Sequence, residues 1–291
     1  SGSVLVAMEW AKSHKHGLFA SWPQIGVPMG TVLANLAVVG ASLTTGAAFT
    51  TWGWRVPFAI SFVLVIVGLW IRLGLEETPI FQELVRESRV ARRPVPEAVR
   101  VCWRPILATV FLRMSELASF IVFAFMVFTI GVRMLHLSRD FILVAVMIGL
   151  TVECCIVPFS GGLSDRFGRK RVFMTGVALS GLVGFLYFAG FSTGAPAIIA
   201  IVIVLSFVPH GIQYGPEAAL IAESFPPALR YSGSSIGYQL ASVIGGGLAP
   251  FITTGLLVRD PAGYLVACYL AAAAIISLIA AALLRPQGEQ A

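Results

Sequence analysis

The sequence has few charged residues for its length. Asp, Glu, Lys and Arg make up 12% of 291 residues, against about 25% in typical soluble domains. Apolar residues make up 57% of the chain, and the mean hydropathy is +0.88. So few charges cannot cover a soluble domain with a hydrated surface, and such high hydropathy excludes disorder. We therefore expect the chain to lie in a lipid bilayer.

The sequence also lacks the patterns of metal, disulfide and catalytic chemistry. Its four cysteines, Cys102, Cys154, Cys155 and Cys268, show no CxxC spacing, so we expect buried apolar thiols. It contains no Walker loop, no HExxH and no serine nucleophile elbow at a strand-to-helix turn, which leaves ATP-driven transport and hydrolysis unsupported. We expect no cofactor, no metal site and no enzymatic activity. The net charge of +6 is attributed to basic cytoplasmic loops rather than to nucleic-acid binding.

Long apolar segments define the fold class. A membrane-spanning helix needs about 20 apolar residues. Eight segments meet this length, and none alternates apolar with polar residues as the strands of a membrane barrel do. The sequence thus predicts an all-α membrane protein with these approximate spans: 18–43, 56–75, 105–132, 141–161, 172–191, 196–222, 232–258 and 262–284.

The basic residues predict the orientation. If the connection at 12–17 is cytoplasmic and the spans alternate from there, only four of the 20 Lys and Arg residues lie on the other side: Arg55, Arg133, Arg139 and Arg259. Arg113 lies within a span, and the rest are cytoplasmic. Since Lys and Arg concentrate in cytoplasmic loops, this bias also predicts a cytoplasmic C-terminus.

The longest connection, 76–104, mixes arginines with five glutamates and contains Pro94 and Pro96. We interpret it as a solvated, partly helical cytoplasmic linker between two bundles. The mixed charge signs argue against a nucleic-acid patch.

The most specific motif is the run GGLSDRFGRK at 161–170, between two spans. Glycines there permit a tight turn and close helix approach, while the arginines can reach carboxylates or helix C-termini on neighbouring helices. This run resembles the GxxxDRxGRK signature of the major facilitator superfamily. The resemblance implies a cytoplasmic gate motif made of Gly161, Asp165, Arg166, Gly168, Arg169 and Lys170.

The resemblance also implies the arrangement of the spans. Members of that superfamily have twelve spans in two bundles of six, and the motif then falls between spans eight and nine. In that register 1–75 is the remainder of an N-terminal bundle, from the end of helix four through helix six. The linker is 76–104, and 105–291 is the C-terminal six-helix bundle. About eight of twelve helices are complete, and further N-terminal helices are expected in a full-length chain.

Further segments resemble the bacterial metabolite–proton symporters of that superfamily. These are the run GLFASWPQIGVPMG at 17–30, WRVPF at 54–58, EETPIF at 76–81, GPEAA at 215–219, ESFP at 223–226, RYSGSSIGYQ at 230–239 and GLAP at 247–250. Known members carry shikimate, 2-oxoglutarate, citrate, proline or betaines. The resemblance therefore implies a small polar substrate, an organic acid or a zwitterion.

Two charged residues lie inside the span at 105–132. Arg113 and Glu116 are three residues apart and share a helix face. Because an ionised side chain at bilayer depth is costly unless it pairs or faces water, we expect Glu116 to take part in proton coupling. Arg113 would hold Glu116 or an anionic substrate. A purely structural ion pair is the alternative. Leu117 stands where the similar family has Asn, which weakens the case for a polar substrate contact there.

Other polar residues within the spans are candidates for the same pathway. Glu153 could be a second protonatable group, a partner for Arg113 or a neutral buried acid. His136 and His210 are expected to be interfacial or hydrogen-bonded residues rather than proton relays. The remaining candidates, for lining the cavity or for packing, are Gln213, Tyr214, Glu217, Tyr238 and Gln239.

Two charged residues near the cytoplasmic edge complete the expected gate. Glu223 and Arg230 are predicted to belong with Arg166 and Arg169 to a network of gate residues, whose ion pairs would hold the cytoplasmic side closed. The pair Glu223–Arg230 repeats the spacing of Glu9 and His16, a faint repeat of the kind that transporter halves show.

The expected function is proton-coupled uptake of a small polar metabolite by alternating access, with protons and the metabolite as the small-molecule partners. The expected location is the bacterial inner membrane, and the expected form is a monomer. The alternative is a truncated remnant or sensor of the same fold that transports nothing.

Overall fold

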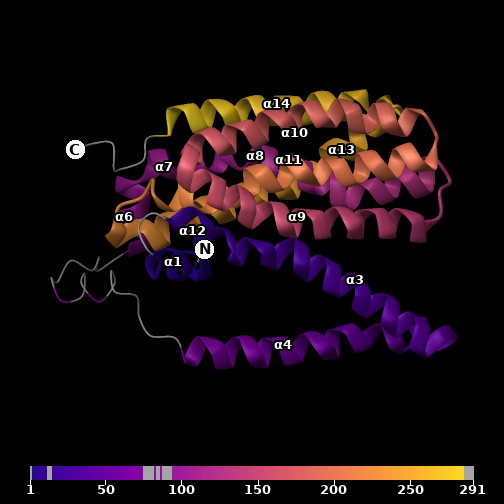
Figure 1. Cartoon of the computed structure of the whole chain (residues 1–291), viewed down its shortest axis with the longest axis horizontal. Coiled ribbons are helices and arrows are strands. Elements are labelled where there is room, and N and C mark those ends of the chain that lie inside the picture. Colours follow the sequence, from indigo (N-terminus) through magenta and orange to yellow (C-terminus); the bar gives the residue numbers. More distant parts are fainter. Residues whose placement is uncertain (1, 12–14, 75–81, 83–85, 87–93, 285–291) are drawn as a thin grey trace.

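The computed structural model describes residues 2–11, 15–74, 82, 86 and 94–284, and all regular structure in them is helical. Long helices run roughly parallel to one another and form a bundle, from which one helical hairpin diverges (Figure 1). This confirms the predicted all-α class.

The N-terminal part contributes short helices and the hairpin. Its elements are α1 (Gly2–Glu9), α2 (His16–Ser21), a 3₁₀ turn (Pro23–Ile25), α3 (Gly26–Thr45), two further 3₁₀ turns (Gly46–Thr50 and Gly53–Arg55) and α4 (Val56–Leu73). α1 and α2 lie against the bundle, whereas α4 lies apart from it (Figure 1). The side chains of α4 are almost all exposed although they are apolar, which suits a lipid environment.

The C-terminal part forms the bundle. Its elements are α6 (Pro94–Val101), α7 (Trp103–Leu112), α8 (Met114–Phe120), α9 (Arg139–Phe167), α10 (Arg169–Ser192), α11 (Pro196–Ala222), a 3₁₀ turn (Pro227–Leu229), α12 (Arg230–Ala241), α13 (Gly247–Arg259) and α14 (Tyr264–Leu283). π-helical segments at Ile121–Met126, Thr129–Met134 and Ser242–Gly246 extend α8 and join α12 to α13. α11 packs against both α9 and α10, so many of its residues are buried.

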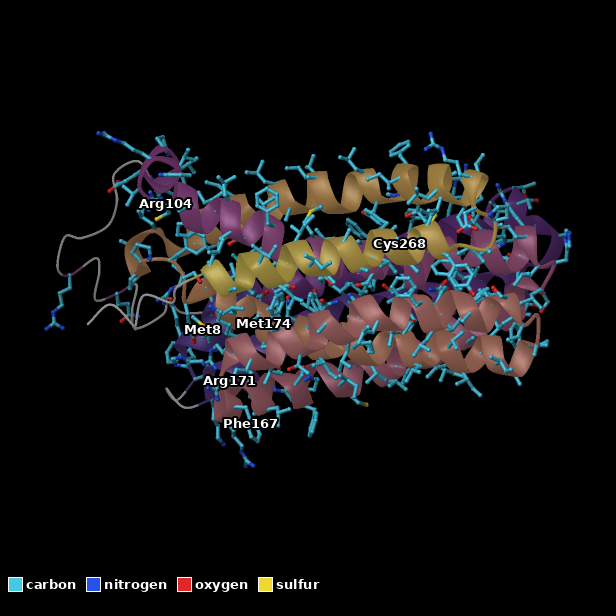
Figure 2. All side chains as sticks on the ribbon, turned by 90° about the horizontal axis from the view of Figure 1, so that it is seen from above. Met8, Arg104, Phe167, Arg171, Met174 and Cys268 are labelled. Carbon is cyan, nitrogen blue, oxygen red and sulfur yellow. The ribbon has the colours of Figure 1, made fainter. Side chains whose placement is uncertain are left out.

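Eight helical stretches of the described residues are long and apolar enough to cross a bilayer. They match the eight predicted spans, and the chain is a multi-pass membrane protein. In Figure 2, Arg104 and Arg171 lie at the same end of the bundle as Phe167, and Cys268 lies toward the other end. The side predicted to be cytoplasmic is therefore one end of the molecule, and the orientation itself stays a prediction.

Part of the predicted linker packs on the bundle. Ala98 of α6 and Cys102 after it are buried in a cluster with Ile106 and Phe225, because the apolar face of α6 lies against α12. Most of the linker, including Glu76, Glu77, Glu83 and Glu87, lies outside the described residues. The boundaries of the two bundles therefore stay predictions.

The first span of the bundle is interrupted at Arg113. The Ser277 hydroxyl of α14 accepts from the Ser115 amide at 2.9 Å and donates to the Phe111 carbonyl at 3.0 Å. These two groups are the partners of an ordinary i to i−4 helix bond. A hydroxyl inserted into the ladder is a recognised cause of a kink, and here it separates α7 from α8.

The expectation for the cysteines is only partly correct. Cys102 is buried and Cys154 half-buried, but Cys155 and Cys268 are exposed. The outer face of a membrane bundle is itself apolar, so an apolar sequence context does not imply burial within the protein.

Candidate functional site

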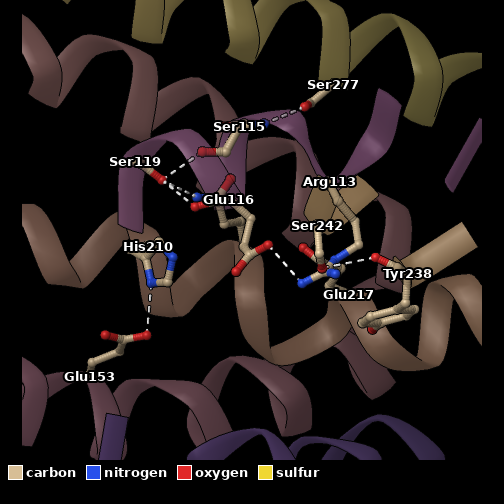
Figure 3. A network of polar contacts seen from close by, with 11 residues as sticks. Arg113, Ser115, Glu116, Ser119, Glu153, His210, Glu217, Tyr238, Ser242 and Ser277 are labelled. Atoms are coloured by element: carbon tan, nitrogen blue, oxygen red, sulfur yellow. Dashed lines mark hydrogen bonds and ion pairs between the residues drawn. The ribbon is translucent and has the colours of Figure 1, made fainter. Parts of the chain in front are cut away.

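One face of α11 carries a row of polar side chains into the bundle. His210, Gln213, Tyr214 and Glu217 follow helical spacing and therefore share a face, and each is at most 5% exposed. Polar residues of α8 lie opposite them. The two faces meet in the layer shown in Figure 3.

Arg113 lies between two carboxylates at one end of this layer. Its Nη2 donates to Glu116 Oε2 at 2.9 Å, and its Nε donates to Glu217 Oε1 at 2.7 Å (Figure 3). The guanidinium carbon lies 4.1 Å from the centre of the Tyr238 ring. We call Arg113, Glu116 and Glu217 the arginine cluster. Glu116 thus meets its predicted partner, and Glu217 joins from a different helix.

The energetics of the cluster follow from its burial. The three side chains are 7%, 7% and 0% exposed. Removing one partner of a buried ion pair leaves an uncompensated charge, which costs about 3–5 kcal/mol. Two carboxylates share a single arginine, so the cluster carries one excess negative charge when all three groups are ionised. A proton or a cationic group would neutralise it.

Glu153 lies on α9 and does not pair with Arg113. Its Oε1 lies 2.7 Å from His210 Nδ1 on α11, and both side chains are at most 1% exposed (Figure 3). His210 was expected to be hydrogen-bonded, and it is. Its partner, Glu153, could not be identified from the sequence.

A hydrogen bond lies between these two groups of residues. Gln213 Nε2 donates to Ser119 Oγ at 3.3 Å, and that hydroxyl donates in turn to the carbonyls of Ser115 and Glu116. The candidate pathway residues thus form a layer of polar groups across α8, α9 and α11.

Of three further residues, Tyr214 contacts this polar layer, whereas Leu117 and Gln239 do not add polar contacts to it. The Tyr214 ring packs on His210 with 5.8 Å between centroids. Leu117 faces Gly245 and Gly246 of the π-helical segment between α12 and α13, so it packs rather than offering a polar contact. Gln239 is exposed on α12 and lies outside the layer, whereas its neighbour Tyr238 contacts Arg113.

A second polar site lies at the end of the bundle that carries the 161–170 motif. Asp165 accepts the amide protons of Gly17 at 2.8 Å and Leu18 at 2.9 Å, so it caps the start of α2. A carboxylate satisfies the unpaired amides of a helix N-terminus and is stabilised by them. The motif therefore ties α9 of the C-terminal bundle to the N-terminal part.

Arginine joins this contact to α11. Arg169 donates from Nη1 to Asp165 at 2.9 Å and from Nε to Glu223 at 2.6 Å. Lys170 donates to the carbonyls of Ala282 and Leu284, at the end of α14. We call Asp165, Arg169 and Glu223 the end cluster.

The remaining gate candidates divide into two groups. Arg230 lies 3.7 Å from Glu9. The basic residue of the second repeated pair therefore lies beside the acidic residue of the first pair. The side chain of Arg166 is exposed, and so is Gly168, whose positive φ of 92° ends α9. Neither takes part in the end cluster.

Glycines bring α2 and α9 into contact beside the end cluster. A methyl group on Gly161 would lie 2.5 Å from Ser21 Oγ and 2.7 Å from the Gly17 carbonyl. One on Gly17 would meet Ser164, Asp165 and the Gly161 carbonyl. Only residues without a side chain fit at both positions, which explains why Gly161 belongs to the motif.

Sequence reasoning found most of these residues but not their pairing. The partner of Glu153 was missed, although His210 shares a face of its helix with the candidates Gln213 and Glu217. Ser277 was missed entirely, because a serine in an apolar helix carries no pattern. No group of three or more residues among the described His, Cys, Asp and Glu side chains could hold a metal ion.

Comparisons with known proteins identify the fold and the relatives. The family model described as Major Facilitator Superfamily matches residues 134–291, and the model described as Sugar (and other) transporter matches residues 1–101. The proton:xylose symporter XylE, bound to 6-bromo-6-deoxy-D-glucose, superposes with a TM-score of 0.73 over 96% of this chain and 66% of that chain. The sequence identity to it is 17%, so the likeness concerns the fold.

Curated relatives are closer in sequence. The chain is 32% identical to the shikimate transporter of Escherichia coli (strain K12), over 98% of this chain and 66% of the relative. It is 31% identical to the citrate-proton symporter of Salmonella typhi, over 88% of this chain and 59% of the relative. The chain thus spans less than two thirds of the length of these relatives. The family and the relatives are transporters, which agrees with the expectation that the chain is not an enzyme.

Proposed function

Since the chain belongs to the major facilitator superfamily, we propose that it carries out proton-coupled uptake of a small polar metabolite by alternating access. The proposed substrate is an organic acid or a zwitterion, and the proposed location is the bacterial inner membrane with the C-terminus in the cytoplasm. The two relatives named above, a shikimate transporter and a citrate-proton symporter, support this class of substrate and the coupling to protons.

The observation that carries the proposal is the arginine cluster. Intramembrane charged residues mark substrate or proton pathways when they face the interior of the bundle. Arg113, Glu116 and Glu217 do so, and they hold two acids against one base. This arrangement changes its internal charge balance when it gains a proton, which is what a coupling site must do.

The chemistry follows from the hydrogen bonds of Arg113. Glu116 occupies Nη2, so a proton on the Glu116 carboxylate weakens that bond and frees a guanidinium donor. A substrate carboxylate can then take the vacated position, because carboxylate is the favoured partner of this fork-shaped donor. Glu217 keeps Nε in place and so preserves the orientation of the guanidinium. Protonation would thereby precede substrate binding.

The end cluster fits the second requirement of alternating access. Asp165 and Gly161 hold α9 against α2, and the Arg169 bond to Glu223 ties the same point to the end of α11. Separation of these contacts would open this end of the molecule while the two parts rock against each other. These contacts are all formed in this structure.

The test is uptake into proteoliposomes under an imposed inward proton gradient. The panel contains labelled organic acids, shikimate and betaines, with an uncoupler as control. Both the chain and the product of its whole reading frame are tested. We expect Glu116→Gln to abolish gradient-driven accumulation and to keep some exchange, while Glu97→Gln on the exposed face of α6 keeps both. Accumulation by Glu116→Gln equal to that of the parent would contradict a coupling role for Glu116.

A protein of this fold that binds a metabolite without moving it is the second candidate. Arg113 is already held by two of the chain's own carboxylates, so the observed state is stable without substrate. This candidate predicts saturable binding of one panel compound to the purified protein with neither accumulation nor exchange.

A further inference from the structure

Glu153 and His210 form an isolated titratable pair inside the bundle. Glu153 comes from α9 and His210 from α11, and their Oε1 and Nδ1 atoms are 2.7 Å apart. The pair does not belong to the arginine cluster, because neither residue bonds to Arg113. Burying ionisable side chains inside a membrane protein is costly, and such residues mark functional sites.

Packing holds the two residues together. A methyl group on Gly211 would lie 2.9 Å from Ile156 and 3.3 Å from Glu153 Cγ, so the glycine lets α9 approach α11 here. Ser160 of α9 donates to the Gly211 carbonyl at 2.9 Å. The His210 ring also lies 5.4 Å from the Phe120 ring and 5.8 Å from the Tyr214 ring, centroid to centroid. The close approach of α9 and α11 and the two aromatic rings therefore hold the pair in position.

Each member of the pair retains one unused polar atom. Glu153 Oε2 and His210 Nε2 are buried and have no hydrogen-bond partner among the described residues. Buried polar atoms are nearly always bonded, and an exception calls for a reason. An atom that binds and releases a proton provides one, since it donates in one protonation state and accepts in the other.

The charge balance of the pair favours one shared proton. With that proton, the pair is a carboxylate beside an imidazolium, or a carboxylic acid beside a neutral imidazole, and it is neutral overall. Loss of the proton leaves a buried carboxylate beside a neutral imidazole. That anion is strongly disfavoured without water, so the pair loses its proton only in a conformation that lets water reach it.

Other titratable groups face the pair from the packed helices. α8 contributes Glu116, and α11 contributes Glu217 and Tyr214, whose ring packs on His210. Cys154 adjoins Glu153 on α9, whereas α3, which packs on α9, has no titratable side chain.

The pair and the arginine cluster are joined by one helix face. His210 and Glu217 are seven residues apart on α11, which corresponds to about 10 Å along the axis. Gln213 lies between them and bonds to Ser119 of α8. A movement of α11 relative to α8 and α9 would therefore change both groups together.

We propose that Glu153 and His210 bind one proton of the transport cycle, at a site distinct from the arginine cluster. In the loaded form, the imidazolium donates from Nδ1 to the Glu153 carboxylate. The proton leaves from Nε2 to water, and Nδ1–H stays on the carboxylate, so that one proton is transferred and no other bond changes. The assignment of this proton to a transport cycle rests on the proposed function, whereas the binding of the proton by the pair does not.

The first test needs no substrate. Purified chain in lipid nanodiscs is taken through a pH series, and carboxyl and imidazole bands are followed by infrared difference spectroscopy. We expect one proton fewer to be released by Glu153→Gln and by His210→Asn than by the parent, with the same bands missing in both. Glu97→Gln on exposed α6 is the matched control and should keep them. Glu153→Asp keeps an acid at the site and should restore the bands, shifted in pH.

Equal proton release from the parent and Glu153→Gln, with both proteins monodisperse and equally resistant to thermal unfolding, would overturn the proposal. If both variants fail to fold, the spectrum of Glu153→Asp decides: a titrating carboxyl and imidazole band pair supports the site, and its absence refutes it. The second test is uptake. Glu153→Gln should lower proton-driven accumulation by about tenfold or more and leave exchange nearly unchanged, as for an intramembrane proton site. No uptake by the parent would refute the proposed function and leave the first test standing.

Discussion

Two arginines of this protein are held in the same way at two depths. Arg113 bonds Glu116 on the adjoining helical turn and Glu217 on α11, while Arg169 bonds Asp165 on the adjoining turn and Glu223 after α11. In each case Nε takes the carboxylate from α11 or its end, and an η nitrogen takes the local one. The hydrogen-bond pattern alone does not distinguish the arginine cluster from the end cluster.

Burial distinguishes them. Glu217 in the arginine cluster is 0% exposed, whereas Glu223 in the end cluster is 28% exposed. Water can hydrate the end cluster when its contacts separate, so breaking it costs little. The carboxylates of the arginine cluster are at most 7% exposed, so breaking one of its pairs costs more. The same three charges can therefore hold a conformation at one depth and carry coupling chemistry at the other.

The largest expected effect comes from removing each arginine in turn. Arg113→Met leaves two buried carboxylates without a cation and should destabilise the protein by about 3–5 kcal/mol. Arg169→Met should cost ~1 kcal/mol, because Glu223 is 28% exposed and can be hydrated, while Asp165 keeps the amide protons of Gly17 and Leu18. Thermal unfolding in detergent measures both changes. As a control, the triple variant Arg113→Met, Glu116→Gln, Glu217→Gln removes all the charges and should regain most of the loss. Equal destabilisation by the two single variants would mean that burial does not separate the clusters.

A smaller effect should follow from opening the end cluster through packing alone. Gly161→Ala places a methyl group against Ser21 and the Gly17 carbonyl, which should cost about 1–3 kcal/mol of packing and push α2 away from α9. Labelling of a Ser21→Cys reporter by a maleimide should then become faster. Gly40→Ala on α3 has open space around it and is the matched control. Unchanged labelling in Gly161→Ala would show that the close glycine contact does not keep this end closed.

The smallest effect concerns the kink that presents Arg113. Ser277→Ala removes the hydroxyl inserted between Phe111 and Ser115 and should destabilise the protein by ~1 kcal/mol. It should also lower proton-driven uptake, because Arg113 shifts relative to Glu217. Ser224→Ala removes a buried hydroxyl that bonds only the Leu220 carbonyl of its own helical turn, and it should leave uptake unchanged. If the two serine variants behave alike, the kink does not position Arg113.

The sequence predicted the elements well and the contacts unevenly. Eight spans follow from apolar runs because the bilayer requires runs of that length. The pair Arg113–Glu116 was predictable because helical spacing puts the two residues on one face. The bond between Glu153 and His210 was not predictable, because it joins two helices whose rotation about their axes depends on packing. Arg166 illustrates the opposite error: the motif includes it, yet its side chain is exposed.

The sequence by itself determined the membrane class, the number of spans, the family resemblance and the identity of the buried charges. Each of these depends on local hydropathy, on short motifs or on spacing within one helix. Only the tertiary structure decided which acid meets which base, that Ser277 breaks the first span of the bundle, and that the two arginine sites differ in burial. These depend on how glycines such as Gly161 and Gly211 let helices from distant parts of the chain approach, and close packing of that kind is settled by all the neighbouring side chains together.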